Sequence, residues 1–396
     1  MDKYRAAAAG GMVLVTALVA SGCGSDDANT ASPSSATTTS SSGAASGGPS
    51  GAGGPGAGGP GGLQTFTAVD LNTDGQNAAG ANTTAVVAAT DAFLTTLSAD
   101  LKDKATFDFT DNQSRQTWSN FPAATVARKG VALTDLSAQQ KTAALAVVKT
   151  MLSEQGYAQV QAIQAADDWL KANSSGGNDQ FGDTDYYIAV YGAPSASAPF
   201  QVQFGGHHLA RNYTFDGDTV SITPDFTGTE PKSFQADGAT VAPLQQKASS
   251  MFAVFDALSS EQHTQAQLSG GTVDDILMGP GVDSGTFPTS EGVLVADLPA
   301  AQKQLVVAAI QSWVGDAAPR EAASLMSAYT EQLDQTRVAW AGSTTVDGEN
   351  TYLRIDGPRV WIELINTRSM STPNVHYHGV YRDKNDDYGS TNPSAS

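Results

Sequence analysis

The feature that most constrains the fold of this chain is a repeat within it. The segment "GVALTDLSAQQKTAALAVV" (Gly130–Val148) matches "GVLVADLPAAQKQLVVAAI" (Gly292–Ile310) without a gap. Every aligned pair, such as Asp135 with Asp297, is separated by the same 162 residues. A period of this length corresponds to a whole structural unit, so we expect a folded region made of two similar halves.

The similarity continues on both sides of this block. Upstream, the residues from Ala92 resemble those from Val254, with one residue of slippage. Downstream, "YYIAVYGAP" from Tyr186 resembles "TYLRIDGP" from Thr351. The alternative is a chance likeness of two alanine-rich helices, and the agreement in order across three blocks argues against it. Each half is therefore expected to contain helices first and strands second.

Local signals agree with this arrangement. A capping box at Ser137 begins one helix, and Gly156 is expected to end it. Alternating apolar residues on either side of Asp216–Gly217 indicate a β-hairpin. We predict an α+β fold of two halves, residues 83–240 and 241–389, related by a pseudo-twofold axis. Each half is a helical pair or bundle followed by antiparallel strands.

The N-terminus has the pattern of an export signal. Lys3 and Arg5 precede a short apolar run, Gly11–Ala20, which is too short to span a bilayer permanently. Small residues directly before Cys23 resemble a bacterial lipoprotein signal over residues 1–23, in which the cysteine becomes the lipidated first residue. An ordinary secretory signal is the alternative. Because Cys23 is the only cysteine, the folded part contains no internal disulfide and no thiolate metal ligand.

Residues 24–64 consist almost entirely of Gly, Ser, Ala, Thr and Pro, which predicts a disordered tether of roughly 35 Å average span. The tail, residues 390–396, is also expected to be disordered. The formal net charge of −19 argues against binding nucleic acid or anionic headgroups. We therefore expect a domain held by a lipid anchor on the extracytoplasmic face of the cell membrane.

Four of the five histidines lie in two short clusters. One is "GGHH", which ends in His207 and His208, and the other is "HYHG", which contains His376 and His378. Residues two apart on a strand point to the same face, so His376 and His378 present two imidazoles side by side. Neutral imidazole is a common ligand of zinc, copper and iron, so the pair is a candidate metal site.

His207 or His208 is the expected source of a third ligand. The repeat predicts that both clusters lie at matching positions, on or beside the third strand after the helices of each half. Adjacent strand residues face opposite sides, so only one of the two imidazoles is expected in the site, unless Gly205–Gly206 forms a bulge. A metal-free polar pocket and purely structural histidines are the alternatives.

Arg211 and Arg382 follow the two clusters at the same strand ends. If the clusters form a pocket, these guanidinium groups are candidates to bind a carboxylate or phosphate of a ligand. The alternative is that each pairs with a nearby aspartate, Asp225 or Asp383, on the surface. Asp225 and Glu363 are further candidate oxygen ligands without a distinguishing pattern.

Other catalytic and binding patterns are absent or incomplete in the sequence. "DLNTDG" at Asp70 resembles the start of a calcium loop, but Ala81 stands where the closing glutamate is needed. No H-E-x-x-H or C-x-x-C occurs in the chain, and no G-x-S-x-G occurs in the folded region. The histidine clusters therefore carry the functional hypothesis.

Several short motifs stand in a characteristic order along residues 85–389. They are "WSNFP" at Trp118, "RKGV" at Arg128, "GGHHL" at Gly205, "WAG" at Trp340, "IDGP" at Ile355, "HYHGVYRD" at His376 and "NDDYG" at Asn385. Together they resemble a bacterial family catalogued as a domain of unknown function. The resemblance implies that the histidine segments are signature positions of the family, without assigning them a role.

These observations lead to two functional hypotheses. The first is an exported lipoprotein that binds a transition metal through its clustered histidines, with metal-dependent catalysis if a coordination position stays open to substrate. The second is a non-catalytic extracytoplasmic module that binds an anionic small molecule. A purely structural envelope protein is a third reading.

Overall fold

The computed structural model describes residue 71, residue 75 and residues 77–174, 181–369 and 371–390. All of these residues belong to one compact unit, which begins at Gly53. The other unit, Met1–Ala52, contains none of the described residues. The predicted signal peptide with Cys23, the tether over 24–64 and the tail after residue 390 also fall outside the described residues. Within those residues, none of the helices has the length and apolar character needed to cross a membrane.

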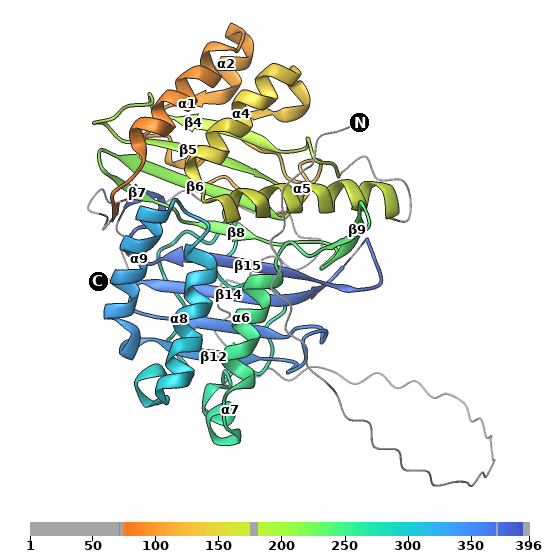
Figure 1. Ribbon diagram of the computed structural model, residues 1–396, viewed down its shortest axis with the longest axis vertical. Coiled ribbons are helices and arrows are strands. Elements are labelled where there is room, and N and C mark those ends of the chain that lie inside the picture. Colours follow the sequence, from red (N-terminus) through yellow and green to blue (C-terminus); the bar gives the residue numbers. More distant parts are fainter. Residues whose placement is uncertain (1–70, 72–74, 76, 175–180, 370, 391–396) are drawn as a thin grey trace, which may run out of the picture. The chain divides into compact units, whose positions relative to one another are not determined.

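A broad, mainly antiparallel sheet of 13 strands forms the centre of the described part (Figure 1). Its main path runs in the order β11-β12-β13-β14-β15-β8-β6-β5-β4-β2, and only the β2–β4 pair is parallel. Strands β3, β1 and β7 join it at β4, β7 and β6, and β9 and β10 form a separate hairpin. The bounds are β1 (Ala78–Ala79), β2 (Thr106–Phe107), β3 (Val131–Ala132), β4 (Tyr187–Tyr191), β5 (Phe200–Gly206), β6 (Leu209–Asp216), β7 (Thr219–Ser221), β8 (Asp225–Thr227), β9 (Phe234–Ala236), β10 (Ala239–Val241), β11 (Val293–Leu294), β12 (Arg337–Ala341), β13 (Tyr352–Asp356), β14 (Val360–Arg368) and β15 (Val375–Asp383).

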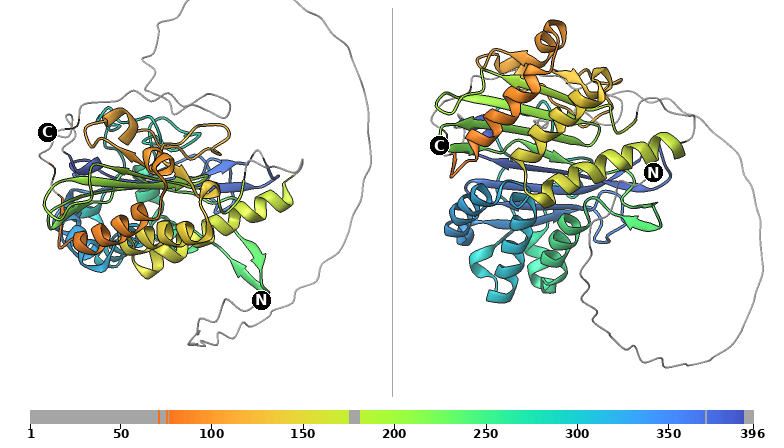
Figure 2. Two further views of the ribbon diagram at one scale, coloured as in Figure 1. Left: turned by 90° about the horizontal axis from the view of Figure 1, so that it is seen from above. Right: turned by 45° about the horizontal axis from the view of Figure 1, so that its top comes forward.

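The long helices pack on one face of this sheet (Figures 1 and 2). The helices of the described residues are α1 (Thr83–Thr95), α2 (Ala99–Ala105), α3 (Asn112–Arg115), α4 (Ala138–Met151), α5 (Glu154–Asn173), α6 (Gln245–Asp256), α7 (Ser260–Ala266), α8 (Ala300–Val314) and α9 (Pro319–Glu331). The predicted capping box at Ser137 begins α4, and an equivalent one at Ser259 begins α7. The α+β class is therefore confirmed.

Two apolar clusters lie on opposite faces of the sheet. The larger one joins the helices to strand residues such as Ile362 and Tyr381. The smaller one, which includes Trp118, Trp361 and Val380, lies between the sheet and long loops. Side chains alternate along a strand, so the residues of β15 at the same parity as Val380 point away from the helices. His376, His378 and Arg382 belong to this set.

The expected correspondence between the two histidine clusters is wrong. Sequence analysis missed β12 (Arg337–Ala341), so the histidine strand β15 is the fourth strand after α9 rather than the third. His207 and His208 lie in a two-residue turn between β5 and β6, directly before the third strand after α5. The predicted hairpin at Asp216–Gly217 is confirmed, because β6 pairs with β7 across it.

A candidate three-histidine metal centre

Three histidine side chains converge on one point inside the protein. Nε2 of His378 lies 3.0 Å from Nε2 of His376 and 3.2 Å from Nε2 of His208. His376 and His378 are neighbours because alternate residues of β15 share a face, as predicted. The turn between β5 and β6 brings His208 to them from a part of the chain 170 residues away. The two clusters therefore meet in space.

The spacing of these rings is close to what one bound ion requires. Two nitrogens bound to a tetrahedral ion at 2.0–2.1 Å are roughly 3.3 Å apart, and the centres of their rings are roughly 5 Å apart. The three ring centroids here are separated by 4.7, 4.9 and 5.1 Å. The three side chains are thus placed so that they could hold a single metal ion.

Burial favours the neutral form of two of the three imidazoles. Burial is the largest cause that lowers the pKa of His208 well below its usual value, and the three neighbouring histidines lower it further. The pKa of His376 is also well below its usual value because of burial, followed by the proximity of His378. Neutral imidazole has a free lone pair, which is the form that binds a metal.

The backbone at His208 has an uncommon conformation. Its φ is 59°, in the left-handed region, where histidine is more frequent than most other residues except glycine. The turn is held because the His208 backbone accepts a hydrogen bond from Gly228 N–H and donates one to the Asn120 carbonyl. Such backbone strain is typical of residues that the surrounding structure keeps in place at functional sites.

Asp275 orients His378 by contacting the ring nitrogen that faces away from the other two histidines. Its Oδ1 lies 2.8 Å from Nδ1 of His378. A carboxylate at Nδ1 accepts a hydrogen bond from the N–H there, which leaves the lone pair at Nε2, the atom that faces the other two rings. Sequence analysis missed Asp275, because adjacent aspartates before an apolar run are also a common surface pattern.

The loop that carries Asp275 is attached to the sheet by a buried carboxylate. Glu363 on β14 accepts hydrogen bonds from the backbone N–H groups of Leu277 (2.6 Å) and Met278 (2.9 Å). Its two oxygens also accept from Tyr352 and Trp361. Glu363, a candidate ligand in the sequence analysis, thus serves to position the loop.

A second group of donors shares His208. The ligand atoms of Asp167, His207 and His208 lie within 4.8 Å of one another, as do those of His208, His376 and His378. Oδ1 of Asp167, on α5, is 2.7 Å from Nδ1 of His207, and its Oδ2 accepts from the Tyr186 hydroxyl at 2.6 Å. Burial raises the pKa of Asp167. Sequence analysis missed Asp167, which lies in the ordinary polar pattern of a helix.

The turn also explains the placement of His207 and His208. Because neither lies on a strand, the rule of opposite faces does not apply to them. His208 enters the three-histidine group, whereas the ring of His207 lies against that of His208, tilted with centroids 3.7 Å apart, and its Nδ1 faces Asp167. His263, the histidine that belongs to neither cluster, is on α7 beside Trp340 and far from this group in the fold.

Arg211 and Arg382 do not line this centre. Arg211 points to the helix face, where it pairs with Asp225 and Asp316 and donates to Gln159. The pairing with Asp225 matches the alternative from the sequence, but it is buried rather than on the surface, since Arg211 is 1% exposed. Asp225 is thereby engaged as an ion-pair partner.

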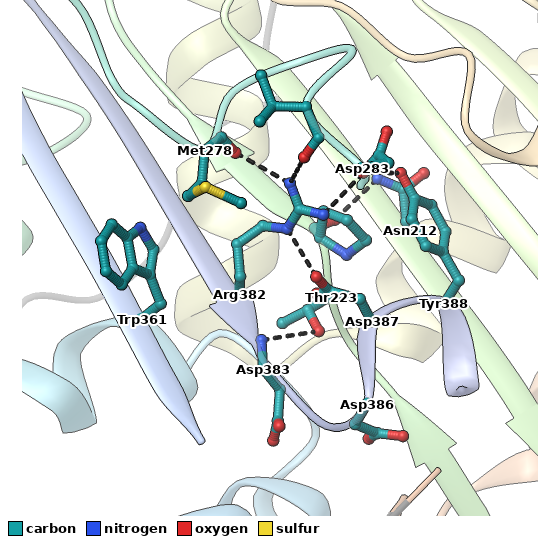
Figure 3. A network of polar contacts seen from close by, with 12 residues as sticks. Asn212, Thr223, Met278, Asp283, Trp361, Arg382, Asp383, Asp386, Asp387 and Tyr388 are labelled. Carbon is teal, nitrogen blue, oxygen red and sulfur yellow. Dashed lines mark hydrogen bonds and ion pairs between the residues drawn. The ribbon is translucent and has the colours of Figure 1, made fainter. Parts of the chain in front are cut away.

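Arg382 points to the opposite face and is also occupied (Figure 3). It pairs with Asp283 (2.7 Å) and Asp387 (2.8 Å) and donates to the carbonyl oxygens of Met278 and Val282. The nearby carboxylates raise the pKa of Arg382 against the effect of burial, so it stays charged. The two arginines lie on different faces of the sheet and have internal partners, and we do not include them in the site.

The fold and the site together define an α+β protein whose broad antiparallel sheet carries a buried cluster of histidines able to hold a metal ion. The chain belongs to the family described as "Protein of unknown function (DUF3500)", which matches residues 79–390. This confirms the resemblance drawn from the sequence motifs. No curated protein and no solved structure matches the chain.

Proposed function

We propose that this protein binds a transition-metal ion, zinc, copper or iron, through Nε2 of His208, His376 and His378. The observation that carries the proposal is the convergence of these three nitrogens at 3.0 and 3.2 Å inside the fold. In the tautomer that carries its proton on Nδ1, each ring directs an Nε2 lone pair at the others, and these repel one another unless a proton or a cation lies between them. An ion satisfies all three at once.

The environment of the cluster supports a metal over a purely structural role. His208 and His376 are buried and neutral, and His378 has a carboxylate at its other nitrogen, the usual partner of a metal-bound histidine. Three protein ligands leave one coordination position for water or substrate. We therefore propose a metal-dependent enzyme, in which the ion polarises a substrate or activates water.

We further propose that the protein is exported and attached to the extracytoplasmic face of the membrane by a lipid on Cys23. The support comes from the residues alone: a basic start, a short apolar run, small residues before a single cysteine, and a Gly/Ser/Pro tether over 24–64. The acidic chain is not expected to bind nucleic acid.

We also propose that the halves 83–240 and 241–389 arose by duplication. The strand order supports this, because β3-β4-β5-β6-β8 and β11-β12-β13-β14-β15 approach the centre of the sheet from its two sides in the same sequence. Each series starts with a short strand followed by a 3₁₀ turn and two helices. On this proposal the metal centre is not duplicated, since its ligands come from different positions of the two halves.

Metal analysis of the full chain, purified without a histidine tag, tests the proposed function. We expect at least one equivalent of zinc, copper or iron per chain. The double variant His376→Ala/His378→Ala should lose the ion of this centre, because two of its three ligands are removed. His263→Ala is the matched control and should keep the wild-type content, since His263 lies on α7 outside the cluster.

Metal content below one tenth of an equivalent in the wild type, or content unchanged in the double variant, would contradict the proposal. The anion-binding module is the rival outcome. It requires Arg211 or Arg382 to exchange a buried carboxylate partner for a ligand. It predicts a thermal stabilisation by a small carboxylate or phosphate that survives chelation and disappears in variants of those arginines.

A further inference from the structure

His208 has two ring nitrogens, and the three-histidine centre uses only one. Its Nε2 faces His378, whereas its Nδ1 has no hydrogen-bond partner in the described part of the chain. The residue is 2% exposed, and a buried polar atom without a partner is costly. An ion in the three-histidine centre does not remove this cost, because it binds at Nε2.

A second set of donors surrounds the same imidazole. Asp167 and His207 place ligand atoms within 4.8 Å of one another and of a nitrogen of His208. An ion in the three-histidine centre would occupy Nε2 of His208, so a second ion held by this set would have to bind Nδ1. The 2.7 Å between Oδ1 of Asp167 and Nδ1 of His207 is close to the roughly 2.9 Å that separates two donors at right angles around one ion.

The chemistry of this second set also suits a divalent transition metal. It offers two imidazoles and one carboxylate, a combination common around zinc and copper. Asp167 supplies a negative charge that the three-histidine ligands lack. Tyr186 holds the other carboxylate oxygen at 2.6 Å, so Asp167 is fixed in position.

The ring geometry predicts the order in which the two positions fill. The rings of His207 and His208 lie close together, tilted by 35° with centroids 3.7 Å apart, whereas those of the three-histidine centre are 4.7–5.1 Å apart. An ion at Asp167 therefore requires the His207 ring to turn partly away from that of His208, and the first ion requires no such movement. The second position should fill after the first and bind more weakly.

We propose that His208 is shared by two metal ions, one at Nε2 with His376 and His378 and one at Nδ1 with His207 and Asp167. This inference rests on the proposed function, since it adds a second ion to that centre. When both nitrogens hold ions, the N–H proton of His208 passes to solvent and the imidazole becomes a negatively charged bridge. The protein is then a two-metal protein.

Titration of the metal-free full chain with Zn²⁺ against a chromophoric chelator tests this proposal. We expect two equivalents of zinc in two steps, with the second at least about tenfold weaker. Asp167→Asn should bind one equivalent at the affinity of the first step. The matched control is Asp168→Asn, which changes the neighbouring exposed residue of α5 and should keep both steps.

A second measurement addresses the bridge directly. With two equivalents of Cu²⁺, an imidazolate bridge couples the two ions magnetically, so the electron paramagnetic resonance signal of isolated copper should largely disappear. In Asp167→Asn the signal of one isolated copper should remain. Two uncoupled copper signals in the wild type would overturn the shared histidine.

The outcomes separate this inference from the proposed function. One zinc per wild-type chain, lost in His376→Ala/His378→Ala, overturns the second ion and leaves the proposed function standing. No zinc at all overturns both. The wild-type count decides the question even if Asp167→Asn fails to fold, which circular dichroism would show.

Discussion

At the scale of single residues, function depends on contacts that short sequence motifs do not contain. The H-x-H pair was predictable, because the period of a strand places His376 and His378 together. Asp275 and Asp167, which contact the outer nitrogens of His378 and His207, were not predictable. A lone aspartate in a loop or a helix is usually a solvated residue, and only the folded structure shows that these two are in contact with histidines.

Glu321 gives a prediction at the same scale. It lies in the first turn of α9, and its Oε1 accepts from the backbone N–H of Asn82 at 3.1 Å. Burial is the main cause that raises the pKa of Glu321 from 4.5 to about 7. Because the folded pKa is above the unfolded one, this residue stabilises the fold fully below about pH 4.5, and the contribution is lost as the pH rises through 7.

We therefore expect Glu321→Gln to increase the free energy of unfolding at pH 8 by about 1–3 kcal/mol relative to the wild type and to change it little at pH 4.5. Glutamine keeps an acceptor oxygen for Asn82 but carries no charge to desolvate. Urea unfolding at the two pH values measures the difference. An equal change at both pH values would show that ionisation of Glu321 is not the cause.

At the scale of elements, the helix that begins at the capping box of Ser137 was predictable, but two assignments failed for identifiable reasons. The segment Arg337–Ala341 is five residues long, and a short apolar run does not distinguish a strand from part of a helix. Gly156 was expected to end a helix, but it lies in the first turn of α5 (Glu154–Asn173). Its role is close approach between chain segments rather than termination.

Gly156→Ala tests this explanation. A Cβ at this position would lie 2.3 Å from the carbonyl oxygen of Asp316, so the backbone at one of the two positions has to move. We expect a loss of about 1–3 kcal/mol in the free energy of unfolding, although alanine normally stabilises a helix relative to glycine. The measurement is urea unfolding at neutral pH.

Gly270→Ala is the matched control, because nothing lies within 4 Å of a Cβ built there. It should change the free energy of unfolding by less than about 0.5 kcal/mol. If Gly156→Ala is as stable as the wild type, the glycine has another explanation, such as a small adjustment of the α8–α9 connection that accommodates the methyl group.

At the scale of the whole molecule, a buried charge network joins the two predicted halves. Asp316, between α8 and α9, binds Arg211 on β6 and Lys247 on α6, and Gln159 on α5 contacts both cations. All the charged members are at most 5% exposed at the side chain. Such a network is costly to break, since removal of one partner leaves buried charge uncompensated.

Asp316→Ala should therefore lower the free energy of unfolding by about 3–5 kcal/mol. Arg211 would keep Asp225 as its carboxylate partner, whereas Lys247 would lose the carboxylate to which it is paired and keep only Gln159 among the contacts named above. The exposed pair of Lys303 and Asp334 provides the control, because Asp334 is 70% exposed and Asp334→Ala should cost less than about 1 kcal/mol. Equal effects of the two substitutions in urea unfolding would contradict the structural role of the network.

The sequence by itself determined the α+β class, the helix-then-strand order, the hairpin at Asp216–Gly217 and the pairing of His376 with His378. These properties follow from short-range periodicity and turn chemistry, which are local. Only the tertiary structure decided that His208 joins the pair, that Asp275 and Asp167 contact the cluster, and that Arg211 and Arg382 are occupied on opposite faces. Those contacts join residues from 5 to 170 positions apart in the chain, and their geometry is set by the packing of the whole sheet.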